Sequence, residues 1–226
     1  MRKCIVLIFL GAAMATGCGK SRTDPPRSAG STREAFHDIA VPSDSRPLIV
    51  ALGDSLTAGL GVEQSQNYPS KLQAEIAAAG YHYRVVNAGV SGDTTAQGLN
   101  RLDSVRSLHP KIVILELGGN DGLRGLPLTE TRSNLESIIG PLQRDGTTVV
   151  LAGMEMPPNY GVAYTTEFRQ IFRDLAKKYH TPLIPFFLAG VGGRPELNQD
   201  DGIHPTAQGY DIVVRNVWTV LKAELR

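Results

Sequence analysis

The sequence predicts an α/β domain in which a parallel sheet is covered by helices on both faces. Short apolar runs alternate with segments of helical spacing from Leu48 to the C-terminus, a pattern typical of repeated βαβ units. Apolar residues make up 42% of the 226-residue chain, enough for a sizeable core, and 20% charged residues argue against global disorder. Ligands of such sheets bind beyond the carboxyl ends of the strands, so a site is expected there.

Each element is predicted from its length, its apolar spacing and the residues at its ends. The first strand runs into Gly53, the third is bounded by Gly118, and the fifth begins just after Pro182. The first helix ends before Gly80, a residue suited to a helix C-cap. The predicted strands are Leu48–Leu52, Arg84–Ala88, Ile112–Leu117, Thr147–Ala152 and Leu183–Phe187. The predicted helices are Tyr68–Ala79, Thr94–Leu108, Thr129–Gln143, Thr165–Tyr179 and Thr206–Leu225.

The N-terminal residues are predicted to be a targeting segment and are left out of the fold. Arg2 and Lys3 are positively charged, and the apolar run Cys4–Ala13 is shorter than the roughly 20 residues that a membrane-spanning helix needs. The segment 15–18, Ala-Thr-Gly-Cys, resembles a bacterial lipobox. We therefore expect residues 1–17 to be a lipoprotein signal peptide and Cys18 to be lipidated. The alternative is an ordinary signal peptide that leaves Cys18 unmodified.

Residues 18–46 are predicted to be a flexible tether, because Ser, Pro, Arg, Asp and Gly predominate there, and residues 47–226 to be the folded domain. The formal net charge is +1 and no basic run is present, so no nucleic-acid partner is expected. The two cysteines are Cys4 and Cys18, so cleavage before Cys18 leaves no disulfide within the mature chain.

The segment Gly53-Asp54-Ser55-Leu56 directly follows the first predicted strand. Gly53 permits a tight turn, which would place Ser55 at a helix N-terminus where free N–H groups point outward. A serine hydroxyl in this position can act as a nucleophile. These four residues alone leave open that Asp54 and Ser55 only cap the following helix.

A general base is predicted in the segment Asp201–Pro205, just before the last helix. A serine nucleophile needs a base within hydrogen-bond reach, and the base needs an orienting carboxylate; His204 and Asp201 can supply both from one loop. Alternatively, Asp201 caps the helix and His204 is a surface residue. The remaining histidines lie in the tether or before strands, at the opposite edge of the sheet: His37, His82, His109 and His180.

Two further loops contain candidate donors for an oxyanion. Gly92, after the second strand, lets a backbone N–H approach a substrate, and Asn120, after the third, offers its amide. Each donor aimed at the developing charge is worth roughly 3 kcal/mol, although both loops could also be simple turns. Ser91 is discounted as a nucleophile, because Asp93 replaces the last glycine of a Gly-x-Ser-x-Gly elbow. No metal-binding motif is found.

Together these blocks resemble the SGNH (GDSL) hydrolase superfamily, from about Leu48 to the C-terminus. The blocks are Gly53–Leu56, Gly92, Gly119–Asp121 and Asp201–His204. Longer stretches are similar to the bacterial periplasmic thioesterase/lysophospholipase and arylesterase branch: Val86–Thr94, Glu116–Gly125, Pro158–Gly161 and Asp200–Pro205. The resemblance implies a three-layer α/β/α, flavodoxin-like fold with a five-stranded parallel sheet.

The resemblance also implies a role for each matching residue. Ser55 is the expected nucleophile, His204 the general base and then acid, and Asp201 the residue that orients it. The N–H groups of Ser55 and Gly92 and the amide of Asn120 are the expected oxyanion hole. No metal and no organic cofactor are implied.

The expected substrate is a small acyl or aryl ester or thioester, lysophospholipids included. An adaptable apolar wall is expected from residues in loops at the strand ends, although any one of them could equally serve ordinary packing. These residues are Leu56, Leu123, Met156, Pro157, Tyr160 and Ile203, with Leu126 and Met154 beside them. A sugar-binding groove is less favoured, because the one tryptophan, Trp218, falls in the last helix.

Two alternatives remain from the sequence, a carbohydrate O-acetylesterase on the same fold and a non-catalytic lipid-anchored binding protein. We expect an exported monomer held on the periplasmic side of a membrane by the lipid on Cys18. Gly19 after that cysteine favours the outer membrane.

Overall fold

The structure is a computed structural model and describes residues 44–226. The predicted signal peptide, Cys18 and the tether up to residue 43 lie outside the described residues. Within residues 44–226, none of the helices combines the length and the apolar character that crossing a bilayer requires.

Five strands form one parallel sheet, as predicted. They are β1 (Leu48–Gly53), β2 (Arg84–Gly89), β3 (Ile112–Glu116), β4 (Thr148–Ala152) and β5 (Leu183–Ile184), in the spatial order β2-β1-β3-β4-β5. Gly53 at the end of β1 pairs with Gly89 on β2 and with Glu116 on β3. The carboxyl ends of these three strands therefore lie side by side, where the loops that follow them can meet.

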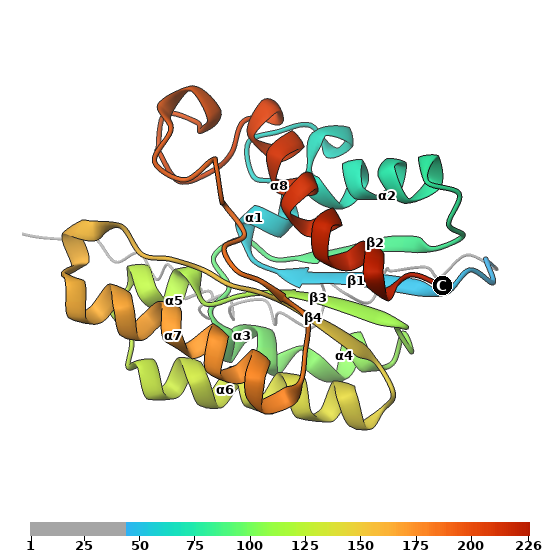
Figure 1. Ribbon diagram of the computed structural model, residues 1–226, viewed down its shortest axis with the longest axis horizontal. Coiled ribbons are helices and arrows are strands. Elements are labelled where there is room, and N and C mark those ends of the chain that lie inside the picture. The colour runs from blue at the N-terminus through green and yellow to red at the C-terminus, as the bar shows by residue number, and fades with distance from the viewer. Residues whose placement is uncertain (1–43) are drawn as a thin grey trace, which may run out of the picture. The chain divides into compact units, whose positions relative to one another are not determined.

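Helices cover both faces of the sheet and complete the expected three-layer α/β/α architecture (Figure 1). Helices α2 and α8 lie on one face, and α3, α4, α6 and α7 lie on the other. The α-helices of the described part are α1 (Ser55–Ala58), α2 (Tyr68–Ala78), α3 (Thr95–Asn100), α4 (Leu102–Arg106), α5 (Gly119–Leu123), α6 (Leu128–Arg144), α7 (Val162–Tyr179) and α8 (Ala207–Leu221). Short 3₁₀ turns occur at Gln64–Gln66, Pro158–Tyr160, Pro195–Leu197 and Lys222–Glu224.

The core lies between the sheet and the two helical layers. Strands β1 and β3 are buried along their whole length, which explains why their sequences are continuously apolar rather than alternating. Helix α7 turns one apolar stripe inward, made of Phe168, Ile171, Phe172 and Leu175. This packing makes the sheet a rigid base for the loops at its carboxyl edge.

Two predicted elements are shorter than expected, for identifiable reasons. The fifth strand stops at Ile184 instead of reaching Phe187, because Pro185 has no N–H to give to a strand ladder. The helix expected over 94–108 is divided into α3 and α4 at Arg101, whose backbone leaves helical geometry at φ −107° and ψ 10°. Helical spacing does not predict α5, because its five residues are too few to show a period.

Candidate active site

Ser55 is the first residue of α1 and directly follows the Gly53-Asp54 turn at the end of β1. Asp54 caps the helix, because its Oδ1 accepts a hydrogen bond from the Leu56 N–H at 2.9 Å. Only glycine fits at position 53, since a Cβ there would lie 2.0 Å from the hydroxyl of a buried threonine in α1. Asp54 therefore does cap the helix, whereas the Ser55 hydroxyl faces His204 and is not a cap.

A continuous chain of hydrogen bonds joins Ser55, His204 and Asp201. His204 Nε2 lies 2.8 Å from Ser55 Oγ, and His204 Nδ1 lies 2.6 Å from Asp201 Oδ2. The other carboxylate oxygen, Asp201 Oδ1, accepts the backbone N–H groups of Ile203 and His204, both at 3.0 Å. The Gln199 N–H donates to the His204 carbonyl at 2.7 Å and closes the loop that presents the ring.

The Asp201 carboxylate stays ionised far into the acid range. Desolvation opposes its charge, but the backbone N–H groups of His204 and Ile203 and the His204 ring outweigh that effect and lower the pKa of Asp201 to about 2. The carboxylate can therefore hold the imidazole in one orientation and stabilise its protonated form.

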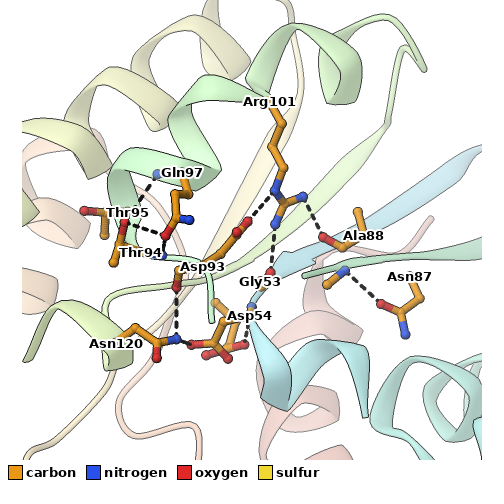
Figure 2. Close-up of polar contacts among 12 residues, drawn as sticks. Gly53, Asp54, Asn87, Ala88, Asp93, Thr94, Thr95, Gln97, Arg101 and Asn120 are labelled. Carbon is orange, nitrogen blue, oxygen red and sulfur yellow. Dashed lines mark hydrogen bonds and ion pairs between the residues drawn. The ribbon is translucent and has the colours of Figure 1, made fainter. Parts of the chain in front are cut away.

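Asn120, on α5, points its amide between two acceptors that come from two other loops. Asn120 Nδ2 donates to Asp54 Oδ2 and to the Asp93 carbonyl, each at 3.0 Å (Figure 2). Both amide hydrogens are thus engaged, so a substrate oxygen must share or displace one of these bonds. The amide is held close to Ser55 by its bond to the preceding residue.

Two backbone N–H groups complete the set of candidate oxyanion donors. Among residues 44–226, no acceptor receives the N–H of Ser55 or of Gly92. Gly92 has φ +85°, a backbone conformation that favours glycine, and its carbonyl accepts a hydrogen bond from Arg124 Nη2 at 2.9 Å. Ser55, Gly92 and Asn120 all line one pocket.

Arg101 ties together the two segments that carry Ser55 and Gly92, and sequence analysis did not predict it. Its guanidinium forms a buried ion pair with Asp93 at 2.7 Å and donates to the carbonyls of Ala88 and Gly53, at 2.7 and 2.8 Å (Figure 2). The side chain reaches back from the break between α3 and α4 to the ends of β1 and β2. Only the tertiary fold brings these partners together, so no local sequence pattern signals the contact.

Asp121 has a structural role beside Asn120. Its buried carboxylate accepts hydrogen bonds from the N–H and the hydroxyl of Thr95, the first residue of α3. This contact fixes α5 against α3, so the orientation of Asn120 does not depend on a free loop.

A pocket of about 640 Å³ opens beside the Ser55 hydroxyl. Most of the residues predicted for an acyl-binding wall do line it: Leu56, Leu123, Met154, Met156, Pro157 and Ile203. Sequence analysis missed other apolar lining residues, among them Leu60, Phe186 and Leu188. Phe186 was missed because it was assigned to the fifth strand, which ends at Ile184 and leaves Phe186 in a loop at the pocket.

Tyr160 and Leu126 do not line this pocket, which corrects their predicted placement. The Tyr160 hydroxyl donates to the Leu123 carbonyl at 3.0 Å, and its ring stacks on Tyr164 at 6.1 Å between centroids. Tyr160 therefore supports the C-terminal end of α5, where Leu123 lies. Within the described residues, no group of three or more His, Cys, Asp or Glu side chains is placed to hold a metal ion.

Comparison with known proteins gives consistent matches over most of this chain. The model of the GDSL-like lipase/acylhydrolase family matches residues 51–212. The esterase TesA of Pseudomonas aeruginosa is 43% identical over 175 residues, covering 77% of this chain and 87% of the relative. The thioesterase 1/protease 1/lysophospholipase L1 of Escherichia coli K12 is 40% identical, covering 73% of this chain and 78% of the relative. A crystal structure of TesA, 44% identical, covers 80% of this chain and 100% of that chain with a TM-score of 0.77.

Proposed function

Because the chain belongs to the GDSL-like lipase/acylhydrolase family, we propose that it hydrolyses carboxylic esters or thioesters through an acyl-enzyme on Ser55. The substrates are those of an arylesterase, acyl thioesterase or lysophospholipase. The observation that carries the proposal is the unbroken line of hydrogen bonds from Asp201 through His204 to the Ser55 hydroxyl, at 2.6 and 2.8 Å.

In the acylation step, Ser55 Oγ attacks the substrate carbonyl carbon while His204 Nε2 takes the hydroxyl proton. The carbonyl oxygen becomes an oxyanion that the N–H groups of Ser55 and Gly92 and the Asn120 amide stabilise. His204 then gives its proton to the leaving alkoxide or thiolate as the bond to the acyl carbon breaks. The products of this half-reaction are an alcohol or thiol and the Ser55 acyl ester.

In the deacylation step, water replaces the leaving group in the pocket. His204 accepts a proton from the water as the oxygen attacks the acyl carbon, and the same donors stabilise the second oxyanion. Collapse of this intermediate returns the proton to Ser55 Oγ and releases the carboxylic acid.

The size and lining of the pocket favour substrates whose acyl group is longer than acetyl. Its volume of about 640 Å³ lies within the range of small-molecule sites, and side chains such as Met156, Phe186 and Leu188 make its surface largely apolar. An acetyl group fills only a small part of that volume. This observation favours longer acyl esters over an O-acetylated carbohydrate, the alternative that the sequence left open.

Turnover of p-nitrophenyl esters by two serine variants tests the proposal. The Ser55→Ala variant is expected to lose hydrolysis of p-nitrophenyl butyrate. The matched control, Ser91→Ala, changes the serine of the broken elbow motif and should keep it. Circular dichroism checks that both variants fold. Turnover retained in folded Ser55→Ala, or lost only in Ser91→Ala, would overturn the assignment.

We further propose that the protein is an exported monomer whose lipid on Cys18 anchors it to the periplasmic side of a membrane, with the outer membrane favoured. The lipobox-like segment 15–18 and the Ser- and Pro-rich segment that follows support this proposal. Intact-mass analysis of the membrane fraction should show a diacylglycerol-sized addition that Cys18→Ser abolishes. An unmodified, soluble wild-type protein would contradict the lipid anchor. The monomeric state is tested by light scattering of a version that lacks residues 1–43, which should give the mass of a single chain.

A further inference from the structure

Glu116 is a fully buried carboxyl group directly beneath the turn that carries Ser55. It ends β3, is 0% exposed, and pairs in register with Gly53. Its Oε2 accepts the Thr57 hydroxyl at 2.8 Å and lies 3.4 Å from the Asp54 N–H, whereas its Oε1 is buried without a hydrogen-bond partner in the described part of the chain. A carboxylate with so few donors is strongly disfavoured away from water.

The Glu116 carboxyl is a neighbour of the buried Asp54 carboxyl: Glu116 Oε2 lies 3.4 Å from the Asp54 backbone nitrogen, and the two side chains act on each other's pKa. Two neighbouring carboxylates in a dry environment disfavour each other's ionisation, so the pair retains one proton. A carboxylic acid can donate that proton to a neighbouring carboxylate, which converts a repulsive contact into a charge-assisted hydrogen bond.

The surroundings decide which of the two groups holds the proton. Asp54 accepts the Leu56 N–H and the Asn120 amide, and the charge of Arg101 also favours an ionised Asp54. Glu116 has no comparable set of donors. Burial raises the pKa of Asp54 to about 6, but it raises the pKa of Glu116 well above its usual range, and the adjacent Asp54 carboxyl raises the Glu116 pKa further. The proton therefore belongs to Glu116 and the negative charge to Asp54.

We propose that Glu116 is a positioning residue that donates a retained proton to Asp54 and thereby holds the Asp54 carboxylate against the Asn120 amide. The proposal rests on the hydrolase function above, because it concerns the orientation of an oxyanion donor. The proton stays within the pair throughout, and no bond to the substrate is made or broken by it. Glu116 thus acts on catalysis only through Asp54 and Asn120.

Other polar groups face this pair from every neighbouring element. The Tyr68 hydroxyl approaches Thr57 from α2, and the Tyr210 hydroxyl approaches from α8, where it donates to the Leu56 carbonyl. Burial and the nearby carboxyls raise the pKa values of both tyrosines, so neither one carries charge near neutral pH. Asp93, His204 and Arg101 also act on Asp54, the first raising and the others lowering its proton affinity.

Infrared spectroscopy of the whole domain directly detects the proton that the Glu116–Asp54 pair retains. At pH 7 the wild-type protein should show the carbonyl stretch of a protonated carboxylic acid, and ¹³C-carboxyl labelling of glutamate should shift it. The band should disappear in Glu116→Gln and persist in the matched control Glu130→Gln, whose side chain is exposed at the start of α6. Absence of the band in wild type, or its survival in Glu116→Gln, overturns the proposal. The isotope shift keeps the test decisive even if Glu116→Gln does not fold.

Kinetics separate positioning from a merely structural role. Glu116→Ala is expected to lower kcat by up to about 100-fold with little change in KM, because the Asn120 amide loses its fixed direction. Glu116→Gln should recover most of this loss, since its amide can still donate to Asp54, and should lack the alkaline loss of kcat that deprotonation of the pair causes in wild type. Identical alkaline limbs in wild type and Glu116→Gln contradict the proposal. If Ser55 is not the nucleophile, fluorophosphonate labelling fails while the infrared band remains.

Discussion

At the scale of single residues, Asp201 differs from a buried catalytic carboxylate because its side chain is 44% exposed. Its two backbone N–H donors nevertheless fix it against the His204 ring. We expect Asp201→Asn to lower kcat for a p-nitrophenyl ester by about 10³- to 10⁴-fold, since the amide no longer favours the productive imidazole tautomer. A loss of less than tenfold would show that the loop backbone alone orients the ring.

The pH dependence of stability gives a test of the buried Glu116 side chain. Its folded-state pKa is raised above the ordinary value of 4.5, so the native state binds the proton more tightly than the unfolded state does. The stability that this proton contributes is therefore complete below pH 4.5 and is lost as pH rises toward the folded pKa. Between pH 4.5 and the folded-state pKa, urea titrations should show the unfolding free energy of the wild type falling by about 1.4 kcal/mol per pH unit relative to that of Glu116→Gln. Parallel pH profiles for the two proteins would contradict this account.

The site residues that the sequence revealed are those whose chemistry is visible in a short motif. Ser55, His204 and Asp201 follow a strand or precede a helix, so their meeting place could be inferred from the topology. Glu116 and Arg101 carried no such signal, because each acts through partners that are distant in the sequence and lie in other elements. In the sequence, Glu116 is a polar residue inside the predicted strand Ile112–Leu117.

At the scale of elements, the Arg101–Asp93 ion pair joins the start of α4 to the loop between β2 and α3. Replacing Arg101 by Met leaves the buried Asp93 carboxylate without its cation, which is expected to cost about 3–5 kcal/mol of unfolding free energy. The double variant Arg101→Met, Asp93→Asn should recover part of that cost. Chemical denaturation measures both values, and additive losses in the double variant would show that the two side chains do not interact.

Most helices and strands were predictable from the sequence, but two boundaries were not. The parallel strands were predictable because helices on both faces make them continuously apolar. The early end of β5 at Ile184 and the helix break at Arg101 were not, although Pro185 was a usable warning for the first. The helix break lies at Arg101, whose side chain bonds to the ends of β1 and β2. The periodicity of the sequence does not contain that information.

At the scale of the whole molecule, the strand order places the segments that follow all five strands, together with the loop that leads into α8, around one apolar pocket. Specificity should therefore follow acyl length, with kcat/KM rising from acetyl to octanoyl p-nitrophenyl esters as successive methylenes are buried. Leu188→Phe should narrow the pocket, which lowers octanoyl turnover while acetyl turnover is kept. A preference for acetyl esters in the wild type would instead favour the O-acetylesterase alternative.

The proposed reaction requires that Ser55 becomes covalently acylated with His204 as its base. Mass spectrometry after reaction with a fluorophosphonate measures this most directly, with peptide mapping of the modified residue. We expect one phosphonyl group per chain, located on Ser55, and labelling that is strongly slowed in His204→Ala. Modification of any other residue, or labelling of Ser55 at an equal rate in folded His204→Ala, would contradict it.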